Sequence, residues 1–355
     1  MTDRMNYLMN ERKRIALIVY STSTNPWHNL AVEEYLMEFT TRAGREGTDY
    51  SILYLWQNSD TVVIGRNQNA WNECRTGLLE EEGGRLARRS TGGGAVFHDM
   101  GNLNFSFITP KADYDTKRSS SVILRAVKSL GIDAVLSGRN DILAEDKKFS
   151  GNAFCIHKEA GLHHGTLLIA SDYARIARYL EVSKAKLESK GVQSVKSRVT
   201  NLSAIVPGLT LDAMKGALEK SFLEEYPAAE VLRYEDTSWI PDEEIQDWVK
   251  KHASWEWRYG QTLSFTAGME TRFEWGGIEI QFLVKEGEIT EARIYSDALD
   301  LDFFEQLAES LQHLRFSSEE IARKIRQMDE NPEAFGATRA KMKEDLAGFI
   351  EEHKL

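Results

Sequence analysis

Residues 85–108 read RLARRSTGGGAVFHDMGNLNFSFI and contain the densest cluster of chemically informative residues in the chain. The glycines of Gly92–Gly94 can adopt positive φ, and their N–H groups can converge on anionic oxygens because no Cβ keeps a ligand away. Arg88 and Arg89 could supply paired N–H donors to a phosphate or a carboxylate. The bare pattern also fits a glycine-rich turn with solvated arginines. It is neither a GxGxxG fingerprint nor a P-loop, because a strand-like alternation follows the glycines and no GK[ST] does.

Around this block, short β-rich runs alternate with amphipathic stretches up to about residue 226, which predicts a mixed α/β domain. We expect strands at 15–20, 51–56, 61–65 and 162–170, and helices at 27–39, 119–130 and 211–226. A boundary is expected within residues 227–253. Beyond it, a three-stranded meander over 270–295 and helical periodicity over 302–314, 317–328 and 339–353 predict a small α+β domain.

Length and composition limit the class of protein. The chain has 355 residues, 42% of them apolar and 28% charged, so it can form two domains and is too apolar to be disordered. The apolar run Ile15–Tyr20 is far shorter than the roughly 20 residues that a membrane span needs. Residues 1–14 show no signal-peptide core. These features predict a cytoplasmic protein without a membrane partner.

The charge is distributed unevenly along the chain. Residues 241–355 contain 14 Lys and Arg and 25 Asp and Glu, a net charge of -11 that equals the net charge of the whole chain. Residues 1–240 contain 30 residues of each sign and are therefore neutral overall. Because DNA requires clustered cations, no nucleic-acid partner is expected. The two cysteines, Cys74 and Cys155, cannot form a disulfide framework and lack the CxxC spacing of a zinc or redox site.

Two later clusters add candidate site residues. In Lys147–Ala153, a lysine that opens an apolar, glycine-broken strand can hold its ammonium at a fixed point near a transferring phosphoryl or acyl group, although a lone strand lysine is also typical of a solvated edge. Asn140 and Asp141 could form a hydrogen-bonding pair, a magnesium site or an ordinary turn. His163 and His164 are adjacent on a strand and point to opposite faces, so one of them can face a ligand cavity.

Seven segments, taken in their order along the chain, resemble the lipoate-protein ligase A family of the biotin/lipoate ligase superfamily. The resemblance covers nearly the whole chain, and the segments are specific together although each is weak alone. They are PWHNLAVEE (26–34), DTVVIGR (60–66), RRSTGGG (88–94), KFSG (148–151), HHGTLL (163–168), SRVTNL (197–202) and WEW (255–257).

The resemblance implies an α/β (α+β) fold, with a large mixed-sheet catalytic domain in residues 1–245 and a small α+β accessory domain in residues 246–355. It also implies an ATP-dependent ligase that converts lipoate and ATP, with Mg²⁺, into lipoyl-AMP and pyrophosphate. The lipoyl group would then pass to a lysine of an apo lipoyl domain, in an E2 subunit of a 2-oxoacid dehydrogenase or in the glycine cleavage H protein.

The same resemblance assigns roles to residues at matching positions. Lys148 is implied to be the catalytic lysine, in contact with both ATP and lipoate. The implied ATP contacts are Arg89, Gly94, Ala95, Val96 and Phe97; the implied lipoate contacts are Ser90, His98 and His164; and further adenylate or metal contacts fall on Gly93, Asn140 and Asp141.

Two alternatives stay open at this point. An octanoyl- or lipoyl-transferase of the same fold would carry a cysteine just before the His-Gly element, where this sequence has Gly161 and Leu162, and Cys155 lies several residues upstream. A protein that binds lipoyl domains without catalysis is the other alternative. The sequence decides neither the acceptor nor the preference between lipoate and octanoate.

Overall fold

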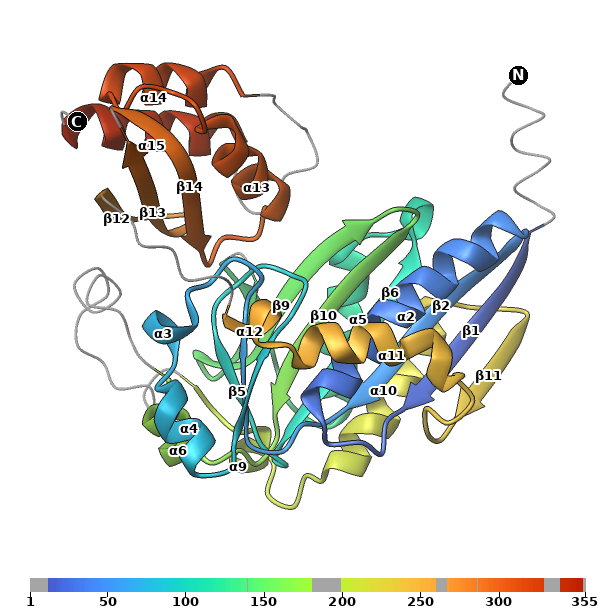
Figure 1. The fold of residues 1–355 in the computed structure, drawn as a ribbon. Coiled ribbons are helices and arrows are strands. Elements are labelled where there is room, and N and C mark those ends of the chain that lie inside the picture. The colour runs from blue at the N-terminus through green and yellow to red at the C-terminus, as the bar shows by residue number, and fades with distance from the viewer. Residues whose placement is uncertain are drawn as a thin grey trace.

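The computed structural model of the protein describes residues 12–138, 140–180, 199–259, 267–285, 287–328 and 339–353. A large sheet with helices on both faces forms the body of the molecule, and a smaller unit built from the C-terminal residues sits above one end of it (Figure 1). Ser197 and Arg198, which belong to one of the resembling segments, lie outside the described residues.

The large sheet has eight strands in the order β11-β1-β2-β6-β10-β9-β8-β7. Strand β1 runs parallel to both of its neighbours, and the other pairs are antiparallel, which confirms the predicted mixed sheet. The bounds are β1 Lys13–Tyr20, β2 Thr48–Trp56, β6 Asn102–Pro110, β7 Val135–Ser137, β8 Asp141–Ala144, β9 Lys147–His157, β10 Ala160–Leu168 and β11 Glu230–Tyr234.

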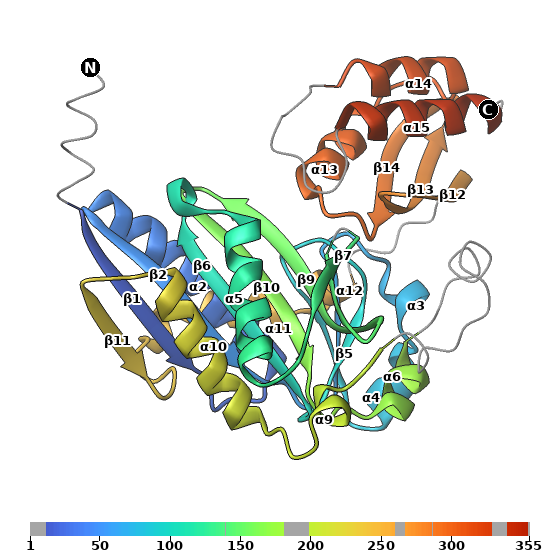
Figure 2. The ribbon, with the colours of Figure 1, turned by 180° about the vertical axis from the view of Figure 1, so that it is seen from behind.

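Helices bury both faces of this sheet. Helices α2 (Pro26–Arg45) and α11 (Asp242–Ala253) cover one face (Figure 1), and α5 (Thr116–Ser129) and α10 (Leu211–Glu225) cover the other (Figure 2). Strand β1 is almost uniformly apolar because Leu17 packs with the first layer and Ile18 with the second. Helix α2 begins one residue before the predicted helix 27–39, and Asn25 caps it by accepting a hydrogen bond from the N–H of Trp27 at 3.0 Å.

The glycine-rich block belongs to a second, three-stranded sheet. Strand β3 (Thr61–Ile64) pairs in parallel with β4 (Arg85–Arg88) and antiparallel with β5 (Val96–His98), so residues 89–95 form the loop between β4 and β5. The short elements that complete this part of the chain are α3 Ala70–Glu73, α4 Thr76–Glu81, η1 Lys111–Asp113, α6 Tyr173–Tyr179 and α9 Leu202–Ile205.

The C-terminal unit has the predicted α+β organisation. Its meander consists of β12 (Ala267–Phe273), β13 (Gly276–Lys285) and β14 (Glu288–Ser296). Three helices pack on the sheet around their own apolar core, namely α13 Leu301–Ser310, α14 Ser318–Arg326 and α15 Arg339–His353.

The predicted domain boundary at residues 245/246 stays a prediction. Helix α11 crosses it and packs along α2, and α12 (Trp255–Tyr259) packs on β4. Within the described ranges, no helix combines the length and the apolar character needed to cross a membrane.

Candidate active site

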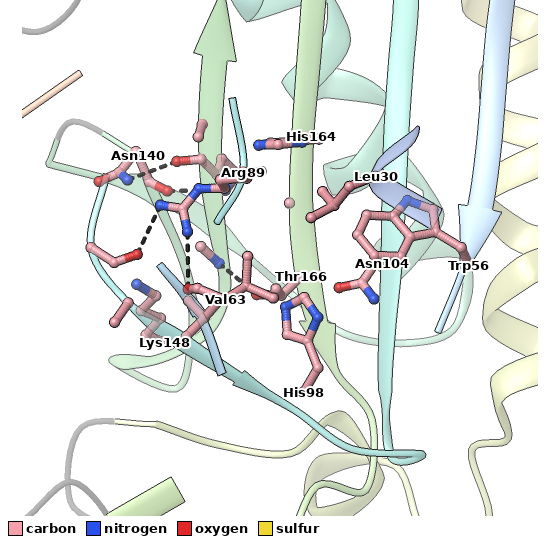
Figure 3. Close-up of a pocket in the computed structure, with 17 residues that line it drawn as sticks. Leu30, Trp56, Val63, Arg89, His98, Asn104, Asn140, Lys148, His164 and Thr166 are labelled. Atoms are coloured by element: carbon pink, nitrogen blue, oxygen red, sulfur yellow. Dashed lines mark hydrogen bonds between the residues drawn. The ribbon is translucent and has the colours of Figure 1, made fainter. Parts of the chain in front are cut away.

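A cavity of about 90 Å³ lies between the glycine-rich loop and the large sheet. The structure brings many of the predicted site residues to its wall, and Figure 3 shows several of them pointing into it. The predicted residues that line it are Arg89, Gly94, Ala95, Val96, His98, Asn140, Lys148 and His164. The lining residues for which the sequence analysis assigned no role are Leu30, Trp56, Val63, Asn104, Gly151, Asn152, Ala153, Gly165 and Thr166.

Four predicted residues lie elsewhere. Ser90 borders a larger cavity between the part that contains the large sheet and the C-terminal unit, and the Phe97 side chain is buried in the core behind β5. Gly93 donates its N–H to the carbonyl of Ala298 at 3.4 Å. Asp141 pairs with Lys148. The predicted roles of all four stay predictions.

Strand β9 positions Lys148 at one end of the cavity. Its Nζ lies 2.8 Å from Oδ1 of Asp141, which opens the neighbouring strand β8. The two side chains are 34% and 38% exposed, so solvent screens this ion pair and its contribution to stability is small. The ion pair therefore orients the ammonium only weakly, and an incoming anion can replace Asp141 as its partner.

Gly151 gives the Lys148 side chain its path. A Cβ on Gly151 would lie 2.9 Å from Lys148 Nζ and 3.0 Å from Cε, and the next nearest atom, Thr166 Oγ1, would be 3.9 Å away. The end of the Lys148 side chain thus occupies the space that a side chain at position 151 would fill. The structure gives a physical reason for glycine in the KFSG segment.

Replacing Gly151 by alanine is expected to displace the Lys148 ammonium without unfolding the protein, because only the flexible end of that lysine stands in the way. A displacement of about 1 Å can cost on the order of 10²-fold in rate. We expect adenylate formation to fall by about 10- to 100-fold at an unchanged unfolding temperature. In a Lys148→Ala background the added loss should vanish, and additive losses in the double variant would contradict this role.

The three glycines of the block serve three different purposes. A Cβ on Gly92 would lie 2.5 Å from the carbonyl oxygen of Ala298, so this glycine allows the C-terminal unit to approach. Gly93 has φ +92°, which favours glycine. A Cβ on Gly94 would have no atom within 4 Å and would stand in the cavity. Of the three, only Gly94 lines this cavity, and the convergence of the N–H groups of the run on an anion stays a prediction.

The two arginines hold the site together. Arg88 donates hydrogen bonds to five backbone carbonyls, so the expectation that it offers charge to a ligand is wrong. Arg89 donates to the carbonyls of Val63, Gly92 and Gly94 while lining the cavity. Burial lowers the pKa of each guanidinium to about 10, which leaves both charged at neutral pH. The acceptors of Arg88 are the carbonyls of Gly65, Arg66, Gln68, Trp257 and Arg258.

A buried chain of hydrogen bonds joins the glycine-rich loop to the sheet. His164 Nδ1 lies 2.8 Å from the Glu33 carboxylate, and its Nε2 lies 2.7 Å from Oγ1 of Thr91. Ser106 donates to the same carboxylate at 2.5 Å. As predicted, the two histidines face opposite ways, because His163 bonds Ser119 and Asn152 on the other side of the strand. Glu33 and Thr91 lie inside the resembling segments, but no spacing along the chain indicates that they meet.

The larger cavity, about 610 Å³ in volume, is lined by residues of the large-sheet part and of the C-terminal unit. Ala153, Phe154 and Leu299 form a small apolar cluster between the two cavities. Arg66 reaches across to Glu305 at 3.5 Å, and the Ser296 N–H donates to the Asn67 carbonyl at 2.5 Å. Together with the Gly93–Ala298 hydrogen bond, these contacts place the C-terminal unit directly on the glycine-rich loop and on the residues that follow β3.

Family comparisons agree with this architecture. Residues 25–223 match the lipoyl protein ligase A/B catalytic domain, and residues 262–350 match the bacterial lipoate protein ligase C-terminus. Because the first match spans more than half of the sequence, the chain belongs to the lipoyl protein ligase A/B catalytic domain family. It is accordingly an enzyme of the lipoate-protein ligase class.

Solved structures show the same relationship. P. falciparum LipL1 in complex with lipoate is 29% identical, with a TM-score of 0.81 over 95% of this chain and 99% of that one. A bipartite lipoate protein ligase from Thermoplasma acidophilum, solved with its E2 lipoyl domain, is 29% identical, with a TM-score of 0.57 over 72% and 99%. A lipoate-protein ligase A bound with ATP is 28% identical, with a TM-score of 0.57 over 70% and 99%.

Proposed function

We propose that this enzyme activates lipoate with ATP and then transfers the lipoyl group to a lysine of an acceptor protein. The observation that carries the proposal is a cavity with the Lys148 ammonium at one end and the apolar side chains of Leu30 and Trp56 at the other (Figure 3). A carboxylic acid with an apolar tail fits this polarity. The lipoate and ATP in the structures of related ligases support the same pair of substrates.

The order of the strands sets the direction of the substrate. Trp56 on β2 pairs with Asn104 on β6, and Asn104 pairs with Thr166 on β10, next to the strand β9 that bears Lys148. Three strand spacings of about 4.8 Å place β2 roughly 14 Å from β9. With its carboxylate at Lys148, an eight-carbon acid would therefore extend toward Asn104 and Trp56.

With lipoate in this orientation, the reaction has two steps, the transfer of AMP to lipoate and the transfer of the lipoyl group to the acceptor. A carboxylate oxygen of lipoate attacks the α-phosphorus of ATP, and pyrophosphate leaves. The acceptor amine then attacks the acyl carbon, loses a proton, and AMP leaves with the bonding electrons. Neither step needs a protein nucleophile, so positioning and the charge of Lys148 provide the catalysis.

We propose Mg²⁺ as the ion that accompanies ATP. Among the described residues, no group of three His, Cys, Asp or Glu side chains could hold a metal by itself. Mg²⁺ is commonly bound by one or two carboxylates together with substrate phosphates and water, and Asp141 beside Lys148 fits that donor set, with Asn140 next to it. When bound, the ion would neutralise phosphate charge.

The proposed acceptors are apo lipoyl domains of E2 subunits and the glycine cleavage H protein, and the proposed compartment is the cytoplasm. The relative solved together with an E2 lipoyl domain supports the first kind of acceptor. The test is to incubate the protein with ATP, Mg²⁺, lipoate and an apo lipoyl domain, and to measure the mass of the acceptor. Binding of the acceptor without a gain in mass would favour a non-catalytic lipoyl-domain-binding protein.

The cysteine-dependent transferase is disfavoured by the position of Cys155. This side chain borders the larger cavity and not the one that holds Lys148, and burial raises the pKa of its thiol. A catalytic thiol requires the opposite shift, because the thiolate is the nucleophile. Cys74 is buried on the far side of β3.

Replacing both cysteines by serine is therefore expected to leave ATP-dependent lipoylation within about twofold of wild type, because neither sulfur reaches the proposed reaction centre. The rate of mass gain of the acceptor, with and without ATP, measures this. A folded Cys155→Ser protein that no longer transfers lipoyl would instead establish the transferase mechanism.

We propose that the C-terminal unit covers the active site and retains the adenylate. Its residues Ala298 and Leu299 contact Gly92. A larger residue at position 92 should therefore displace the C-terminal unit while leaving the cavity wall unchanged. For Gly92→Val we expect about tenfold less lipoyl-AMP to remain bound after gel filtration, because water reaches an exposed mixed anhydride.

Transfer from supplied lipoyl-AMP should change little in Gly92→Val. Deleting residues from about 254 onward would test the role of the C-terminal unit less cleanly than Gly92→Val. The deletion also removes the carbonyls of Trp257 and Arg258, which accept hydrogen bonds from Arg88. Normal retention of adenylate combined with failed transfer would assign the unit to acceptor docking instead.

A further inference from the structure

A chain of hydrogen bonds runs from Asn29 through Asn58 to His98, which lines the cavity beside Trp56. The His98 ring meets Trp56 edge-on, with centroids 6.1 Å apart, and both residues line the cavity. His98 is 3% exposed. In Figure 3 its ring lies beside Asn104, between Lys148 and Trp56. If lipoate binds as proposed above, its dithiolane ring comes to the Trp56 end of the cavity.

Hydrogen bonds determine which nitrogen of His98 carries the proton. Asn29 donates through Nδ2 to the backbone carbonyls of Ser23 and Gln57, each at 2.9 Å, so the orientation of its amide is fixed by groups that can only accept. The same Nδ2 lies 3.0 Å from the Asn58 amide, and because Nδ2 can donate but not accept, the Asn58 atom that faces it is the acceptor Oδ1, which shares one of the two N–H groups with a backbone carbonyl. The remaining atom of that amide, Asn58 Nδ2, therefore donates to His98 Nδ1 at 3.1 Å.

With Nδ1 as an acceptor, the neutral ring bears its proton on Nε2. Burial, reinforced by the charge of Arg89, lowers the pKa of His98 to about 3, so the ring is neutral at physiological pH. Nε2 has no hydrogen-bond partner among the described residues, and neither has Nδ2 of Asn104 on the same wall. Two buried donors beside each other in the cavity wall thus lack acceptors, although nearly all buried polar groups have a partner in folded proteins.

We propose that Asn29 and Asn58 are positioning residues that hold His98 as its Nε2–H tautomer, and that this N–H donates to a dithiolane sulfur, so that the site prefers lipoate to octanoate. The inference rests on the proposed function. Sulfur is a weak acceptor, but the tail of octanoate offers none. Octanoate would leave the donor buried against methylene groups, which should lower its kcat/KM relative to lipoate by about tenfold.

Two variants test this chain. Asn58→Asp can still accept from Asn29 but presents an acceptor to Nδ1, which moves the ring proton from Nε2. His98→Phe keeps a ring of similar size and removes the donor. In both, the ratio of kcat/KM for lipoate to that for octanoate in adenylate formation should fall about tenfold, chiefly through lipoate. Asn69→Asp, at the start of α3 and outside this cavity, is the matched control and should keep the wild-type ratio.

A second measurement does not depend on activity. ¹⁵N NMR of the histidine rings should show His98 of the wild-type protein as the Nε2–H tautomer. An Nδ1–H tautomer in the wild type, or a ratio that stays within twofold in both folded variants, would overturn the proposal. A wild-type protein that forms adenylate from neither acid would contradict the proposed function instead, while the NMR spectrum would still report on the tautomer.

Discussion

Lys148→Ala is expected to be severely defective in both half-reactions, with each rate about 10²–10³-fold below wild type. The Lys148 ammonium stands beside Asp141 at the end of the cavity where the carboxylate of lipoate and the α-phosphate would meet. It would reduce the repulsion between the two anions and then stabilise charge on the phosphorus and on the departing AMP. Adenylate formation and transfer from supplied lipoyl-AMP are to be measured separately.

Two variants control this prediction. Lys147 is exposed and does not line the cavity, so Lys147→Ala should change neither rate by more than about twofold. Lys148→Arg should not restore activity, because a wide planar guanidinium does not fit the narrow path of the lysine across Gly151. Near-normal rates of both half-reactions in Lys148→Ala would refute the assignment.

Gly94→Val is expected to abolish adenylate formation while leaving the unfolding temperature nearly unchanged. The position has ordinary φ and no atom within 4 Å of a Cβ, so the fold has room for the side chain. That room is the cavity itself, which would lose space that the substrates need. Binding of ATP and of lipoate by calorimetry, together with a thermal melt, measures the two effects.

Gly93→Val serves as the comparison for Gly94→Val. Gly93 has positive φ, and a Cβ would lie 3.0 Å from Arg89 Nη2, so this variant should also lower the unfolding temperature. A Gly94→Val protein that melts several degrees earlier and still forms adenylate at the normal rate would show that the loop has a structural role only.

Local patterns in the sequence were sufficient for much of the architecture. The apolar run Ile15–Tyr20 indicated a strand, and the pattern of short runs and turns after residue 270 indicated a meander; the structure confirms both. Both are properties of short segments, because side-chain direction repeats every two residues in a strand. The edge position of β11 was not predictable in this way, since its pairing with β1 joins residues more than 200 positions apart.

The candidate site, too, could be predicted only in part from the sequence. The residue types at 148, 164 and 92–94 indicated chemistry from the sequence alone, and the structure places Lys148, His164 and Gly94 around one cavity. The sequence could not distinguish Arg88 from Arg89, because the difference depends on which backbone carbonyls surround each guanidinium.

The remaining properties of the site depend on contacts between residues that are far apart in the sequence. Glu33 reaches His164 across 131 positions of sequence, and the tautomer of His98 depends on an amide 40 positions away. Such contacts arise when helix α2, the glycine-rich loop and the large sheet pack together, and their geometry has no local signature. Residue types and their order along the chain indicate which side chains are chemically capable of the reaction, whereas packing decides which of them line the cavity and which support the residues that do.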